Sequence, residues 1–140
     1  MAWDASDLKI ETTVPVTSDK GIVSARRQGR NLAEEMGFSA TDATLVTTAI
    51  SELARNIVYY AGAGEILLGK VNGQDRPQGI AVIARDSGPG IPDLQLALRE
   101  SLPASGGLGL PGVRRIMDEF DIDSRPGGGT TVTTVKWKRR

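Results

Sequence analysis

The segment that decides the fold is TDATLVTTAISELARNIVYYA, residues 41–61. Asp42 or Thr41 is expected to begin a helix here, and Gly62 follows its expected end near Ala61. Its apolar side chains recur every three or four residues, the spacing of one helix face; they are Leu45, Val46, Ala49, Ile50, Leu53, Ala54, Ile57 and Val58. A helix with so broad an apolar face is a core element.

The segments around this helix carry shorter patterns. Further helices are expected over residues 18–36, 93–99 and 111–117, the first of them beginning at Ser18 or Asp19. Strands are expected over residues 8–16, 65–71, 79–85, 120–124 and 130–137. This order indicates an α+β fold, a two-layer α/β sandwich in which helices cover one face of a mixed, mostly antiparallel sheet. A length of 140 residues fits a single domain, 1–140.

The composition excludes several kinds of site. The chain has no cysteine and no histidine, which rules out disulfides, cysteine zinc sites, Ser-His-Asp triads and a phosphohistidine relay within it. Proton transfer at neutral pH therefore falls to a carboxylate or a lysine.

The charge balance gives no indication that the protein binds nucleic acids or membranes. The 17 basic and 17 acidic residues cancel, so no net field attracts either. The basic end at residues 136–140 is interpreted as a solvated strand end or tail. No apolar run reaches the ~20 residues that span a bilayer, and the N-terminus lacks a signal-peptide pattern. We expect a soluble, cytoplasmic protein.

Glu52 and Asn56 lie four residues apart, so the expected helix places both side chains on one face. A glutamate can accept a proton, and an asparagine oxygen can bind Mg²⁺. Taken alone, the pair is better explained as an ordinary hydrogen-bonded pair on a polar face.

Three glycine-containing segments add to this pair. Asp86-Ser87-Gly88-Pro89-Gly90 follows an expected strand, where glycines allow close approach of a ligand or form only a turn. Residues 106–112 lead into a helix N-terminus, which suits a phosphate, although a flexible loop is the plain alternative. A Rossmann site is rejected because no strand precedes this segment. Residues 127–130 are expected to form a hairpin turn that ends at Thr130.

The order of these four motifs resembles the GHKL (Bergerat-fold) nucleotide-binding family. Residues 50–57, 86–93 and 110–120 further resemble the RsbT-like switch kinases of the bacterial stressosome, and the resemblance spans residues 10–137. It implies an ATP- and Mg²⁺-dependent protein serine/threonine kinase that acts in partner switching.

The resemblance also implies roles for single residues. Glu52 matches the catalytic glutamate, Asn56 the Mg²⁺-binding asparagine, Asp86 the aspartate that accepts from the adenine amino group, and Thr130 a threonine near the adenine. The remaining cofactor-binding positions are the turn glycines Gly88 and Gly90, the phosphate-lid residues Gly107, Leu108 and Gly109, and Arg55, which is expected to reach a phosphate or a partner.

The implied partners are a STAS-domain scaffold or antagonist protein (RsbS/RsbR-like) as substrate and a PP2C-type phosphatase (RsbU-like) as activation target. Leu110-Pro111-Gly112 follows Gly109 directly, so the lid is shorter than in RsbT-like kinases. The short lid adds weight to an alternative, a weakly catalytic or non-catalytic ATP-binding interaction module (an anti-sigma factor or phosphatase activator) that acts by sequestration and release. Residues 101–109 are expected to be mobile without nucleotide.

Overall fold

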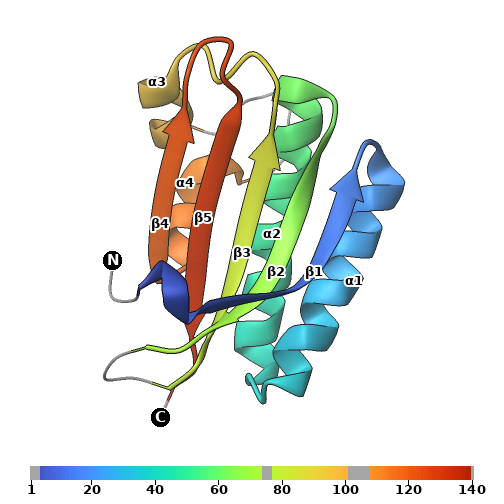
Figure 1. Cartoon of the computed structure of the whole chain (residues 1–140), viewed down its shortest axis with the longest axis vertical. Helices are drawn as coiled ribbons and strands as arrows, with labels where there is room; N and C mark the ends of the chain where they lie inside the picture. Colours follow the sequence, from blue (N-terminus) through green and yellow to red (C-terminus); the bar gives the residue numbers. More distant parts are fainter. Residues whose placement is uncertain (1–3, 74–76, 101–107, 140) are drawn as a thin grey trace.

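The structure, a computed structural model, describes residues 4–73, 77–100 and 108–139 (Figure 1). The elements follow one another as η1 (Ala5–Asp7), β1 (Leu8–Val16), α1 (Asp19–Glu35), α2 (Ala40–Ala61), β2 (Gly64–Val71), β3 (Gly79–Asp86), α3 (Leu94–Arg99), α4 (Gly109–Ile116), β4 (Glu119–Ser124) and β5 (Thr130–Trp137). Every expected helix and strand is present. The largest difference is at α4, which begins two residues before the expected Pro111.

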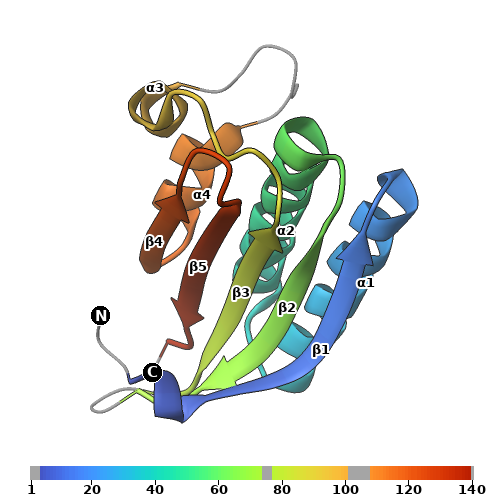
Figure 2. The same ribbon diagram turned by 45° about the horizontal axis from the view of Figure 1, so that its top comes forward.

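The five strands form one sheet in the order β1-β2-β3-β5-β4. All four strand pairings are antiparallel. The sequence predicted a mixed, mostly antiparallel sheet, and the observed pairings are antiparallel throughout. Helices α1, α2 and α4 lie behind one face of the sheet, while α3 lies at its upper end (Figures 1 and 2). The α+β sandwich expected from the sequence is confirmed.

Helix α2 fills the centre of the core. Ile50 and Leu53 are almost completely buried, in one cluster with the core-facing side chains of β2 and β3. The helix begins at Ala40, one or two residues before the expected start, because the Ser39 hydroxyl caps it by accepting from the Asp42 amide at 3.1 Å. It ends at Gly62, whose positive φ of 80° suits glycine.

The C-terminal strand contradicts one expectation from the sequence. Lys136 and Trp137 were expected in a solvated strand end or tail, yet each is only 5% exposed. Trp137 packs with Val71, Ala81 and Val135 on the sheet face opposite the main helices, and its indole Nε1 donates to Glu119. The lysine-rich composition suggested solvent, but the register of β5 directs these two side chains onto the sheet.

Lys136 points to the other face and fixes the end of α4. Its Nζ donates to the Ile116 carbonyl at 2.8 Å and lies 3.8 Å from Asp118 Oδ1. The last carbonyls of a helix have no partner within it. A buried ammonium here satisfies one of these carbonyls and interacts favourably with the negative end of the helix dipole.

We expect Lys136→Met to lower the free energy of unfolding by about 1–3 kcal/mol, since a charged hydrogen bond is lost while the aliphatic stem is kept. Urea unfolding measures the effect. Lys138→Met, at a partly exposed position two residues further on, is the control and is expected to change stability little. Equal stability of Lys136→Met and the wild-type protein would contradict this account.

Within the described residues, no helix combines the length and apolar character needed to cross a bilayer.

Candidate active site

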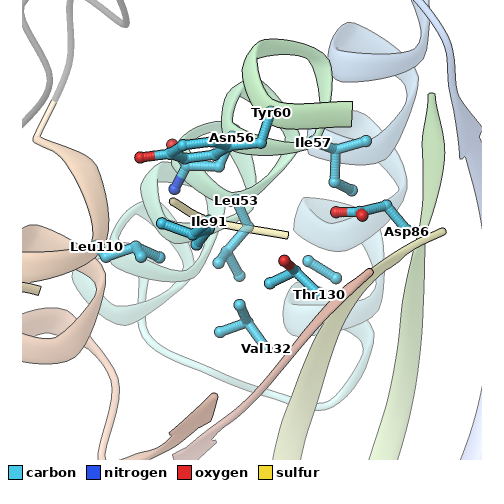
Figure 3. Close-up of a pocket in the computed structure, with 10 residues that line it drawn as sticks. Leu53, Asn56, Ile57, Tyr60, Asp86, Ile91, Leu110, Thr130 and Val132 are labelled. Atoms are coloured by element: carbon cyan, nitrogen blue, oxygen red, sulfur yellow. The ribbon is translucent and has the colours of Figure 1, made fainter. Parts of the chain in front are cut away.

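A small cavity lies at the upper end of the sandwich, where β3 ends, β5 begins and α2 runs past both (Figures 1 and 3). Three of the predicted site residues, Asn56, Asp86 and Thr130, line it together. The rest of the lining is mainly apolar: Leu53, Ile57, Tyr60, Ala84, Ile91, Leu110 and Val132. An apolar pocket with a few convergent polar groups is the usual form of a small-molecule site.

Asp86 is fixed by the loop that follows it. Its Oδ1 accepts from the Gly88 amide at 2.9 Å, which leaves the rest of the carboxylate to face the cavity. A side chain at Gly88 would clash with Ala61, because its Cβ would lie 2.5 Å from the Ala61 Cβ. Gly129 has φ of 77°, and a Cβ added there would lie 2.3 Å from the Asp86 carbonyl oxygen. Glycines therefore let the Asp86 loop pack between α2 and the β4–β5 turn.

Thr130 is held opposite Asp86 by the β3–β5 pairing. Its hydroxyl shares a hydrogen bond of 2.8 Å with the Ser124 hydroxyl, which also accepts from the Ile91 amide at 2.8 Å. Ser124 was not predicted from the sequence, although the β4–β5 hairpin register places it directly across from Thr130. This network fixes the threonine and ties the loop after β3 to β4.

Gly90 completes that loop. Its φ is 86°, and a Cβ there would lie 2.4 Å from the Arg125 carbonyl oxygen. In the structure the space beside Gly88 and Gly90 is thus taken by the protein itself.

Glu52 lies near this cavity, but its carboxylate is engaged elsewhere. The residue is only 4% exposed, and its Oε1 accepts from the Leu108 amide at 3.0 Å and from Arg55 Nη1 at 3.2 Å. Its Oε2 accepts from the Gly109 amide at 3.1 Å. A carboxylate from α2 therefore caps the N-terminus of α4, where the helix dipole favours negative charge.

The contact of Arg55 with a phosphate or a partner, expected from the resemblance, stays a prediction. In the structure its guanidinium pairs with Glu52 one turn earlier on α2, while its side chain is 43% exposed. Of the predicted lid residues, Leu108 and Gly109 form the start of α4. Gly107 lies outside the described residues, as do residues 101–106 of the segment expected to be mobile.

Asn56 carries an unsatisfied polar atom. Its Nδ2 is buried and has no hydrogen-bond partner within the part of the chain that the structure describes. A buried donor of this kind is costly unless a ligand or water completes it. The asparagine projects from α2 at the cavity, where a phosphate oxygen would satisfy the amide nitrogen and a cation the amide oxygen (Figure 3).

The described residues contain no group of three or more acidic side chains that could enclose a metal ion. Mg²⁺ commonly binds through one or two protein ligands and completes its shell with water and substrate phosphates. Asn56 fits that mode, and ATP would supply the phosphates.

Tyr60 separates the cavity from a larger groove outside it. The inner cavity leaves only about 10 Å³ of free space, whereas the neighbouring groove, lined by Tyr59, Pro89, Pro92 and Leu96 among others, has about 570 Å³. Tyr60 lines both. Burial, and then the adjacent Tyr59, raise the pKa of the Tyr60 phenol, so it is neutral at physiological pH. Tyr60 lies one turn after Asn56 on the same face of α2, and this spacing would have predicted that Tyr60 lines the cavity.

A family model described as the histidine kinase-like ATPase domain matches residues 16–136, which includes every part of this site. The chain belongs to this family. The resemblance to the GHKL family, inferred from the sequence motifs, is thereby confirmed.

Similar proteins indicate which branch of this family the chain resembles. The chain is 47% identical over 131 residues to the serine/threonine-protein kinase RsbT of Bacillus subtilis. This alignment covers 92% of this chain and 98% of RsbT. It is 27% identical over 97 residues to an anti-sigma F factor of Caldanaerobacter subterraneus, covering 66% of this chain and 68% of that protein. The chain is therefore RsbT-like, and the similarity supports the expected enzyme class, a protein serine/threonine kinase.

Two solved structures share the fold. One contains the RsbU and RsbW domains of a Mycobacterium tuberculosis protein, with TM-score 0.59, 22% identity and coverage of 93% of this chain and 33% of that one. The other is the histidine kinase domain of a blue-light activated kinase from Erythrobacter litoralis, with TM-score 0.51, 19% identity and coverage of 84% and 60%.

Proposed function

We propose that the chain is an ATP- and Mg²⁺-dependent kinase that phosphorylates a serine or threonine of a STAS-domain scaffold or antagonist protein. The 47% identity to RsbT over nearly the full length of that kinase supports the reaction class. The observation that carries the site is the unsatisfied Asn56 Nδ2 in a cavity that also gathers Asp86 and Thr130.

In the proposed reaction Asp86 accepts from the adenine amino group, and Thr130 contacts the same base. Asn56 would hold Mg²⁺, which, when bound, neutralises phosphate charge. The acceptor hydroxyl attacks the γ-phosphorus, the bond from that phosphorus to the ADP oxygen breaks, and the hydroxyl proton passes to Glu52. Positioning and charge stabilisation provide most of the catalysis in reactions of this type.

The proposed setting is partner switching in the cytoplasm. The chain would act as one kinase domain, bind its STAS substrate, and after phosphorylation bind and activate a PP2C-type phosphatase of the RsbU kind. The similarity to RsbT and to an anti-sigma factor supports a role in such regulation. The alternative is the same partner binding without efficient catalysis.

The decisive experiment mixes the protein with labelled ATP, Mg²⁺ and a cognate STAS protein. Label is expected on a serine or threonine of the STAS protein, and Asn56→Ala is expected to remove it. Asn31→Ala, at an exposed asparagine of α1, is the matched control and is expected to keep full transfer. Partner binding without label transfer would reject the kinase proposal and leave the binding module.

A further inference from the structure

The backbone amides at the start of α4 hold the carboxylate that the proposed reaction requires as its base. Leu108 and Gly109 donate to the two different oxygens of Glu52, and Arg55 donates to one of them as well. Oε1 thus accepts two hydrogen bonds and Oε2 accepts one, which occupies three of the roughly four acceptor positions of the carboxylate. In the arrangement that the structure shows, the start of α4 and Arg55 hold both oxygens of Glu52, and only Oε2 keeps an open acceptor position.

We propose that these two amides form one anion seat with alternating occupants: Glu52 in the nucleotide-free protein, and the terminal phosphates of ATP in the complex. Phosphate binding displaces Glu52, which then becomes free to accept the proton. The inference rests on the proposed function, because it assumes that ATP is the ligand of the neighbouring cavity.

The electrostatics of the seat allow only one occupant at a time. Glu52 is 4% exposed and Gly109 is buried, so a phosphate beside the carboxylate would place two negative charges together with little water to screen them. Repulsion at such contacts is far stronger than at the surface. A phosphate carries more charge than a carboxylate and offers more acceptor oxygens, so it competes well for the same N–H groups.

A second donor supports phosphate entry from the cavity side. Asn56 lies four residues after Glu52 on the same face of α2, and its Nδ2 is buried without a partner among the described residues. An incoming phosphate would satisfy that amide together with the α4 amides. Arg55 pairs with Glu52 and is 43% exposed, so it can stay paired while the carboxylate turns away.

The test measures nucleotide binding without an acceptor protein. Removing the internal competitor in Glu52→Ala is expected to tighten ATP binding roughly tenfold, because a charge-assisted hydrogen bond is worth about that factor. Glu52→Gln is expected to show a smaller gain, since its amide oxygen still accepts one hydrogen bond. Adenosine has no phosphate to enter the seat, so its affinity is expected to be unchanged. Isothermal titration gives all the dissociation constants, and Glu34→Ala at an exposed glutamate of α1 is the control.

The outcomes separate this inference from the proposed function. Unchanged or weaker ATP binding by both Glu52 variants, with a wild-type protein that binds ATP, overturns the exchange and leaves the kinase proposal intact. A wild-type protein that binds neither ATP nor adenosine overturns both.

A measurement on the wild-type protein tests the exchange even if the Glu52 variants fail to fold. Nuclear magnetic resonance is expected to show the Leu108 and Gly109 amide signals and the Glu52 side-chain carboxyl signal shifting with ATP and Mg²⁺ but not with adenosine. If ATP binds while the Glu52 carboxyl signal stays unchanged, the exchange does not occur.

Discussion

Phosphoryl transfer to the STAS protein is expected to fall by roughly 10²–10⁴-fold in Glu52→Ala, the range typical for loss of a general base. The substitution removes the carboxylate proposed to take the acceptor proton, while the cavity lined by Asn56, Asp86 and Thr130 remains. Single-turnover transfer of labelled phosphate measures the rate, with ATP saturating so that changes in nucleotide affinity do not enter.

Glu34→Ala, a substitution of an exposed helical glutamate, is expected to keep the wild-type rate. Part of the loss in Glu52→Ala is expected to return in Glu52→Asp only if the shorter side chain still reaches the acceptor. Transfer at the wild-type rate in Glu52→Ala would remove Glu52 from the chemistry and leave it as the cap of α4.

ATP affinity is expected to fall roughly 10²-fold in Asp86→Ala. The adenine amino group loses its acceptor, and the Gly88 amide loses the 2.9 Å hydrogen bond that shapes the loop. Unmade hydrogen bonds at a buried polar site cost about 1–3 kcal/mol each, so two of them account for a loss of this size. Titration calorimetry with ATP measures the dissociation constant.

Asp86→Asn makes this prediction more specific. The asparagine oxygen can still accept from Gly88, but its amide nitrogen would face the base as a donor, which suits the carbonyl of guanine rather than the amino group of adenine. The ratio of ATP to GTP affinity is therefore expected to decrease. Asp123→Ala, at an exposed aspartate near the end of β4, is the control. An unchanged ratio would show that Asp86 does not contact the base.

The sequence was informative where local patterns and motif order decide the outcome. The apolar spacing in residues 41–61 predicted α2 and its buried face, and strands β1 and β5 were predicted with their observed bounds. Asn56, Asp86 and Thr130 were predicted as site residues through family resemblance, and in the structure they line one cavity.

What the sequence did not reveal depends on contacts between distant segments. Nothing in the local pattern shows that Glu52 caps a helix that begins 57 residues later, or that Lys136 closes the other end of that helix. The basic composition of residues 136–140 suggested solvent, whereas sheet register buries two of these side chains. Ser124 needed the hairpin register before it could be connected to Thr130.

The position of β5 within the sheet has a consequence for the order in which the protein can fold during synthesis. This strand leaves the ribosome after all the others, yet it lies between β3 and β4. Until it emerges, β3 has one unpaired edge and β4 has no neighbour in the sheet. Asp86 also lacks Thr130 across from it during this time. A nascent chain that has already made Glu52, Asn56 and Asp86 therefore has no complete cavity until its last strand pairs.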